Sequence, residues 1–172
     1  MNIALVYGST TGKAEDAADA IEEHLGDHIT QRFDIEEISV EALKAFDVIL
    51  VGCSTWDIGE LQNDWYHAVE KADGQPVRFE GTRVAFFGDG DQSGYPLNFQ
   101  DALGILRDFF VQRGAVADLG HTSTEGYDFE ASKGVIDDKF VGLALDDLNQ
   151  GELNDERIEE WCAQLKSELQ LG

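Results

Sequence analysis

Basic residues are scarce in this sequence: 12 Lys and Arg stand against 35 Asp and Glu, which gives a formal net charge of −23. Such a charge repels phosphate backbones and anionic headgroups, so we expect neither nucleic acid nor a membrane as a partner. An acidic surface instead favours basic patches on other proteins, because electrostatic steering accelerates their encounter. Adaptation to a salty habitat explains the same acidity, so charge alone does not establish the function.

Cysteines and long apolar runs are also scarce. Cys53 and Cys162 form no CxxC pair, and the four histidines lack ligand-like spacing, so we expect no metal site. No apolar run approaches the length of a membrane span, and the opening MNIALVYGST lacks the basic start and long apolar stretch of a secretory signal. We therefore expect a cytoplasmic location.

Short apolar runs alternate with segments of helical periodicity along the chain. The length suits one domain, which we assign to residues 1–172. A polar stretch at residues 120–139 interrupts this rhythm, and we interpret it as an insertion in the last strand. The expected strands cover residues 3–7, 29–35, 48–53, 84–87 and 140–145. The expected helices cover residues 14–25, 61–72 and 99–110, and a final helix is capped by Asn154.

Five apolar strands that alternate with helices predict an α/β fold. Right-handed crossovers place helices on both faces of a parallel sheet, which gives a three-layer α/β/α sandwich. Ligands of such sheets bind beyond the carboxyl ends of the strands. Three loops at those ends therefore carry the candidate chemistry.

The first loop, residues 8–14, reads GSTTGKA and lies between a strand and a helix. Its backbone N–H groups and hydroxyls predict a neutral cradle for a phosphate group. Its glycine spacing is one residue short of a Walker loop, and no GxGxxG follows the strand, so a single terminal phosphate fits best. An ordinary Ser/Thr-rich turn with a helix cap remains the alternative.

The second loop, residues 54–60, reads STWDIGE, and the third, residues 88–95, reads GDGDQSGY. Trp56 from one and Tyr95 from the other can enclose a flat ring between them. Taken alone, Trp56 could instead be a surface aromatic or a core residue.

The segments YGSTTGKAED, STWDIGELQNDW and GDGDQSGYPLNFQDALG resemble the phosphate loop and the two flavin loops of flavodoxins. GYDFEASKG and FVGLALDDLNQ, after the interruption, resemble the long-chain subgroup. The resemblance implies the flavodoxin-like strand order 2-1-3-4-5 and non-covalently bound FMN. It also implies a monomeric, low-potential one-electron carrier and not an enzyme. The implied partners are redox proteins with basic docking faces: an NADPH-dependent flavodoxin/ferredoxin reductase and an electron acceptor enzyme.

The resemblance also implies the FMN-binding residues. Trp56 is expected to stack on the inner face of the ring and Tyr95 on the outer face. The family often has Thr or Asn where this chain has Ala14, so we expect a somewhat weaker affinity for FMN. The full implied set is Ser9, Thr10, Thr11, Gly12, Lys13, Ala14, Ser54, Thr55, Trp56, Asp57, Ile58, Gly59, Gly88, Asp91, Tyr95, Gln100 and Asp146.

In flavodoxins the peptide after the tryptophan turns over and accepts the proton of the half-reduced flavin. Here that peptide joins Asp57 and Ile58. Neither residue is glycine, which tolerates unusual backbone angles, so the turnover should cost more than in a glycine-containing loop. We therefore expect moderate stabilisation of the semiquinone.

Two other functions share this pattern of elements. A flavodoxin-like NAD(P)H-dependent quinone or FMN reductase is the alternative, although two covered ring faces would exclude a nicotinamide. A phosphorylatable receiver needs acidic residues after the first strand and an Asp after the third. This sequence has Tyr7 and Gly8, and Cys53 and Ser54, at those positions. The insertion is expected to lie outside the FMN site and to concern partners.

Overall fold

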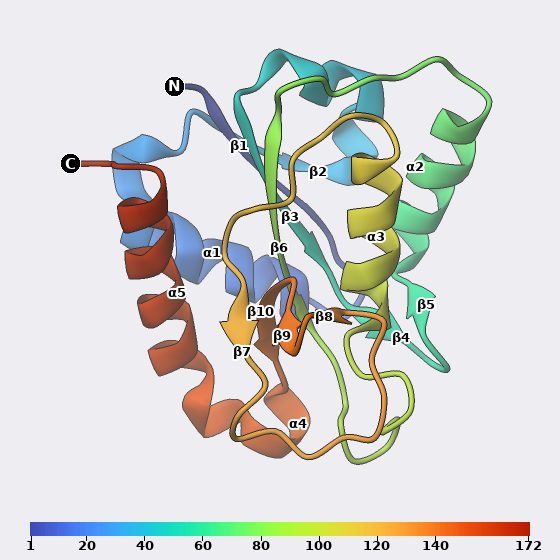
Figure 1. The fold of residues 1–172 in the computed structure, drawn as a ribbon, viewed down its shortest axis with the longest axis vertical. Coiled ribbons are helices and arrows are strands. Elements are labelled where there is room, and N and C mark those ends of the chain that lie inside the picture. The colour runs from blue at the N-terminus through green and yellow to red at the C-terminus, as the bar shows by residue number, and fades with distance from the viewer.

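The computed structural model describes residues 1–172, and its centre is a parallel sheet of five strands (Figure 1). The order β2-β1-β3-β6-β10 is the predicted order 2-1-3-4-5, which is therefore confirmed. β1 pairs with β2 on one side and β3 on the other, so the sheet grows in opposite directions from this strand. The strands are β1 (Ile3–Gly8), β2 (Gln31–Asp34), β3 (Val48–Cys53), β6 (Arg83–Asp89) and β10 (Gly142–Leu145).

Helices cover both faces of the sheet, so the predicted three-layer sandwich is confirmed (Figure 1). One face carries α1 (Lys13–Leu25) and α5 (Asn154–Glu168), and the other carries α2 (Asn63–Asp73) and α3 (Asp101–Val111). The short α4 (Asp147–Gln150) lies beyond the end of β10. Four 3-10 helices complete the helical elements: η1 (Gly26–His28), η2 (Ile35–Glu37), η3 (Val40–Ala45) and η4 (Gly151–Leu153). We find no helix with the length and apolar character that crossing a bilayer requires.

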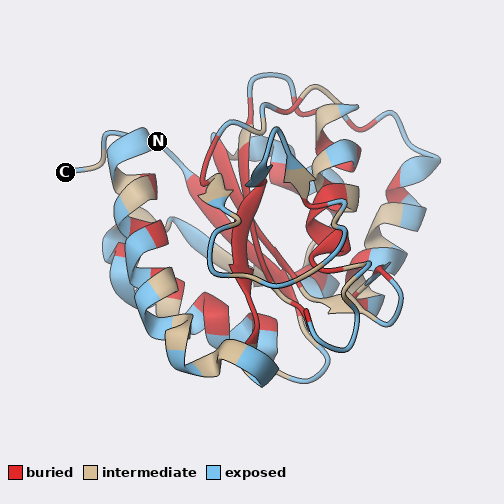
Figure 2. Ribbon diagram, turned by 60° about the horizontal axis from the view of Figure 1, so that its bottom comes forward, coloured by how far each residue is buried: buried red, intermediate tan, exposed pale blue.

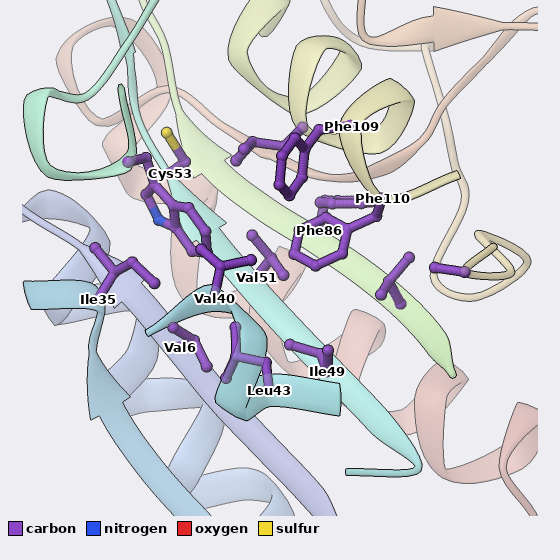
Figure 3. Close-up of a cluster of buried hydrophobic side chains, with 14 of the residues drawn as sticks. Val6, Ile35, Val40, Leu43, Ile49, Val51, Cys53, Phe86, Phe109 and Phe110 are labelled. Carbon is purple, nitrogen blue, oxygen red and sulfur yellow. The ribbon is translucent and has the colours of Figure 1, made fainter. Parts of the chain in front are cut away.

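The core consists of two layers of side chains, one on each face of the sheet. Figure 2 shows that the strands of the central sheet are mostly buried. β3 supplies both layers because successive side chains of a strand point to opposite faces. Ile49, Val51 and Cys53 pack toward α2 and α3 (Figure 3), whereas Val48 and Leu50 pack toward α1 and α5. A continuous apolar run is therefore what this doubly covered strand needs.

The starts of three helices differ from the prediction. α2 and α3 begin two residues later than predicted, and α5 begins at the residue that was predicted to cap it. α2 starts after Leu61, which pairs with Thr55 in a hairpin, and Gln62 caps the helix. α3 starts after Gln100, whose φ of 61° is left-handed and outside the helix. Asn154 was predicted to cap the last helix, but it is the first helical residue, and its side chain donates to Asp147 instead.

The last strand of the sheet is interrupted, as predicted. Val116 forms a parallel bridge with Arg83, and pairing resumes when Gly142 lies beside Phe86. Between them the chain forms a small sheet of β7 (Thr122–Ser123), β9 (Lys139–Phe140) and β8 (Val135–Ile136). Phe140 was predicted to open the last strand, but it pairs within this small sheet and packs on Phe99.

We predict that Gly104→Ala destabilises the protein, because its new methyl group would overlap the carbonyl oxygen of Lys133 where α3 contacts the interrupting segment. Overpacking of this kind should lower the free energy of unfolding by about 1–3 kcal/mol in urea titrations. Gly74→Ala is the control, because nothing lies within 4 Å of its added carbon. Stabilisation of Gly104→Ala, as helix propensity alone predicts, would contradict this close approach.

Candidate functional site

Three loops meet beyond the carboxyl ends of β1, β3 and β6, at the lower edge of the sheet in Figure 1. They enclose a cleft of about 390 Å³. Trp56 and Tyr95 both line it, so two aromatic rings from different strand ends face one space. The cleft is lined by Thr11, Ser54, Thr55, Trp56, Asp57, Asp89, Gly90, Asp91, Tyr95 and Leu148.

The first loop presents backbone donors that no protein group satisfies. Between Thr10 and Glu15 only the N–H of Gly12 has a partner, the hydroxyl oxygen of Ser9 at 3.0 Å. Gly12 itself has a φ of 89°, and no side chain caps α1. An uncapped helix N-terminus with several free N–H groups is a site for an anion.

The side chains of the first loop point in different directions. Thr11 lines the cleft, whereas Thr10 lines a larger hollow that Trp56 also lines. The methyl group of Ala14 is buried in the core layer of α1. The ammonium of Lys13 forms an ion pair with Asp147, and this hydrogen bond raises its pKa.

The second loop is the tip of a hairpin between β4 (Thr55–Trp56) and β5 (Glu60–Leu61). Asp57 has a φ of 46°, a left-handed conformation that costs free energy for a residue with a side chain. Gly59 has a φ of 89°, and a methyl group there would overlap the carboxylate of Asp101. The exposed Ile58 lies between them, and the Thr55 hydroxyl accepts the N–H of Ala102 at 3.0 Å.

The third loop is held by two carboxylates. Asp91 accepts the N–H groups of Ser93 and Gly94 at 3.2 and 2.8 Å, and the Gly94 bond above all lowers the pKa of Asp91. Asp146 is fully buried and accepts both the backbone N–H and the side-chain amide of Gln92, at 3.0 and 2.8 Å. These bonds fix the turn from which Tyr95 projects.

Gln100 and Gly88 were predicted to bind the ligand, but neither lines the cleft, and Asp146 does not line it either. Gln100 is fully buried and donates to the carbonyl oxygens of Gly88 and Leu145, both at 3.0 Å, so it joins β6 to β10. Gly88 is buried within β6, and its added carbon would overlap the carbonyl oxygen of Cys53. Of the loop residues, Ser9, Gly12, Lys13 and Ala14 belong to the first loop without lining the cleft, and Ile58 and Gly59 belong to the hairpin tip.

Sequence reasoning missed three residues that line the cleft: Asp89, Gly90 and Leu148. Asp89 and Gly90 lie between Gly88 and Asp91, which were predicted to bind the ligand, and this position in the sequence could have indicated that they line the cleft. Leu148 is 77% exposed and comes from α4, which follows the interrupted strand, so nothing local indicated its place.

A second hollow of about 760 Å³ shares Trp56 and Asp57 with the cleft. Its walls come mainly from the hairpin and α2, with Tyr66 and Val69 among the apolar contributors. Of the first loop, only Thr10 reaches it. The cleft, by contrast, combines all three loops and is the better candidate for the binding of a flat ring joined to a phosphate.

Asp89 is the perturbed acid of this site. Burial raises its pKa to about 6, and the nearby Asp146 and Asp147 add to the rise. The N–H of Asp147 donates to Asp89 at 2.8 Å and partly opposes this effect. A carboxylate in this position makes the cleft unfavourable for further negative charge.

Comparison with known proteins identifies the family. The family model for flavodoxin matches residues 5–161. The chain belongs to the flavodoxin family. It is 51% identical over 170 residues to the flavodoxin of Trichodesmium erythraeum, covering 97% of each chain. It is 45% identical over 173 residues to a flavodoxin of Klebsiella pneumoniae, covering 98% of this chain and 95% of that one.

A solved flavodoxin has the same fold. The crystal structure of Fusobacterium nucleatum flavodoxin bound to flavin mononucleotide superposes with a TM-score of 0.88 at 29% identity. The match covers 97% of this chain and 98% of that chain. The flavodoxin resemblance seen in the sequence, which rested on the three loops around the cleft, is therefore confirmed for the family and the fold.

We predict that Asp89→Asn stabilises the ligand-free protein at neutral pH. The Asn oxygen can still accept the Asp147 N–H, and the buried charge is removed. Because folding raises the pKa of Asp89 from 3.8 to about 6, its stability contribution is complete below pH 3.8 and is lost as pH rises through 6. The variant's advantage should thus grow from near zero at pH 4 to at most about 3 kcal/mol at pH 8.

Urea unfolding of both proteins across this pH range measures the difference, in which titrating groups far from Asp89 cancel. An advantage that does not change with pH would show that Asp89 does not titrate as its surroundings require.

Proposed function

We propose that this chain is a low-potential one-electron carrier that holds FMN non-covalently in the cleft between Trp56 and Tyr95. The observation that carries this proposal is one cleft lined by both aromatic rings and by Thr11 of the first loop, a loop whose N–H groups are largely unsatisfied. Bound FMN would supply the redox chemistry, since its ring takes up and releases electrons singly. Membership of the flavodoxin family supports the same function.

The residues of the first loop fit the phosphate of FMN. Free N–H groups at the start of α1, with the hydroxyls of Ser9 and Thr11 beside them, would bind it. The ammonium of Lys13 is already paired with Asp147, so backbone donors and the helix dipole would do most of this binding. Ala14 adds its N–H but no hydroxyl, and the weaker affinity expected from this remains a prediction.

Trp56 and Tyr95 would hold the ring and exclude water from its faces. Asp57, Asp89 and Asp91 also line the cleft, inside a protein of net charge −23. Their field would destabilise negative charge on a reduced ring, and for this reason we propose a low potential. Asp57 already has a left-handed φ of 46° without being glycine, and the turnover of its peptide with Ile58 remains a prediction.

The reductase alternative has less support. A nicotinamide must stack on the ring to transfer hydride, and rings on both faces would prevent that contact. The relatives at 51% and 47% identity are both named flavodoxin.

We propose that the partners are an NADPH-dependent flavodoxin/ferredoxin reductase and an electron acceptor enzyme, each with a basic docking face. The excess of 35 acidic over 12 basic residues supports this electrostatic fit. The exposed Leu148 lines the cleft, and the exposed Ile58 follows the cleft residue Asp57, so both offer apolar contact near the site. We further propose a monomer in the cytoplasm, where the two buried free cysteines stay reduced.

We propose that residues 1–172 form one domain, in which residues 120–139 are a long-chain insertion used by partners. No residue of 120–139 lines the cleft. The insertion does contact the third loop, since the N–H of Asp128 donates to Gln92 at 2.6 Å.

We predict that the FMN-loaded protein, photoreduced without oxygen, passes through a one-electron-reduced stage. A long-wavelength absorption band should rise and then decay, because the cleft opposes the negative charge that the fully reduced ring would carry. Direct bleaching of the yellow form would contradict a one-electron carrier. Steady turnover of NADPH and a quinone by the pure protein would favour the reductase instead.

We also predict that Trp56→Ala and Tyr95→Ala each raise the Kd for FMN roughly 10- to 100-fold, because each removes one stacking surface. Fluorescence titration of the ligand-free protein measures the change. Tyr66→Ala is the matched control: this aromatic is 53% exposed and lines the larger hollow, so the Kd should not change. Equal effects of all three substitutions would place the flavin elsewhere.

A further inference from the structure

Gln62 is a polar residue that lines neither hollow, yet its contacts reach the first loop. It is 0% exposed and caps the N-terminus of α2. Helix caps are normally Ser, Thr, Asp or Asn, whose short side chains suffice for the task. A longer side chain in this position indicates a second partner beyond the helix that it caps.

The contacts of the Gln62 amide determine its orientation. Its oxygen accepts the N–H groups of Asp64 and Trp65, at 3.1 and 3.2 Å, which can only donate. Its nitrogen therefore faces the other way and donates to the Thr10 hydroxyl at 3.0 Å and the Asp64 carboxylate at 2.8 Å. All of these bonds are consistent with one orientation of the Gln62 amide, and both of its hydrogens are donated.

The bond to Thr10 joins segments 52 residues apart. Gly8 allows this approach, because a methyl group at that position would overlap the Gln62 side-chain oxygen. The N–H of Thr10 is among the unsatisfied donors of the first loop. Ser9 holds Gly12 within the loop, and Gln62 is the side chain that holds its tip at Thr10 from outside.

We propose that Gln62 is a positioning residue for the phosphate site: by fixing Thr10, it keeps the N–H groups of the first loop directed at one anion. Its hydrogen bond to the hydroxyl oxygen of Thr10 restrains the loop at an exposed residue. Thr10 and Gln62 act as one unit, so removal of either partner has the same consequence. This inference rests on the proposed function in taking the anion to be the phosphate of FMN.

The test compares Gln62→Met, Thr10→Val and the double variant in ligand-free protein, titrated with FMN and with riboflavin, which has no phosphate. Each single variant should raise the Kd for FMN about five- to tenfold, as the loss of one hydrogen bond does. The Kd for riboflavin should change less than about twofold. The Kd of the double variant for FMN should be no higher than that of the single variant that binds FMN more weakly.

Thr10→Val keeps the α2 cap intact, so a folding defect of Gln62→Met does not decide the result. Ser39→Ala is the control for cap loss, since Ser39 caps η3 through the Ala42 N–H without reaching the first loop. It should bind FMN as the unaltered protein does.

Equal losses for FMN and riboflavin would overturn the inference, because they would show only a general structural role. Additive effects in the double variant would overturn it too, because Thr10 would then act independently of Gln62. Calorimetric titration with inorganic phosphate separates the inference from the proposed function. Phosphate binding that weakens in both single variants would support the positioning role even if the unaltered protein failed to bind FMN.

Discussion

Burial of both faces of the central sheet is the constraint on which the rest of the structure depends. β1 and β3 are buried along their whole length and contain no charged residue. A charged side chain there would lose its hydration, so the polar chemistry is displaced to the loops beyond the strand ends. Because β1, β3 and β6 are neighbours in the sheet, their three loops converge on one cleft. The position of the site thus follows from the packing of the core.

Buried polar side chains then fix loops that lack regular secondary structure. Gln62, Gln100 and Asp146 are each 0% exposed, and each bonds to at least one segment distant in the sequence. An amide or carboxylate in such a place is stable only when it is hydrogen-bonded, so each permits few arrangements of the segments that it joins. The shape of the cleft is accordingly set by residues that do not line it.

The same distinction explains how far the sequence predicts the molecule. Apolar runs such as VILVGC predict strands because burial on both faces requires them, and the loops follow the strands directly. The starts of α2 and α3 were predicted at the wrong residues, because Gln62 and Gln100, which precede these helices, are not typical helix caps. Both side chains bond to distant partners. Periodicity could not show that Thr10 turns away from the cleft or that Leu148 enters it, since tertiary contacts decide both.

The acidity of the chain raises a physical question, since a protein of net charge −23 is proposed to bind an anionic phosphate. The nearest ammonium, that of Lys13, is paired with Asp147, and Glu15 and Asp16 occupy the first turn of α1. Net attraction therefore cannot come from side-chain charge. Unsatisfied N–H groups can supply it, because their dipoles act at hydrogen-bond distance while the distant carboxylates are screened by salt. The carboxylates of Asp57, Asp89 and Asp91 line the ring site and would oppose negative charge on the fully reduced ring, so binding and low potential would arise from separate parts of one cleft.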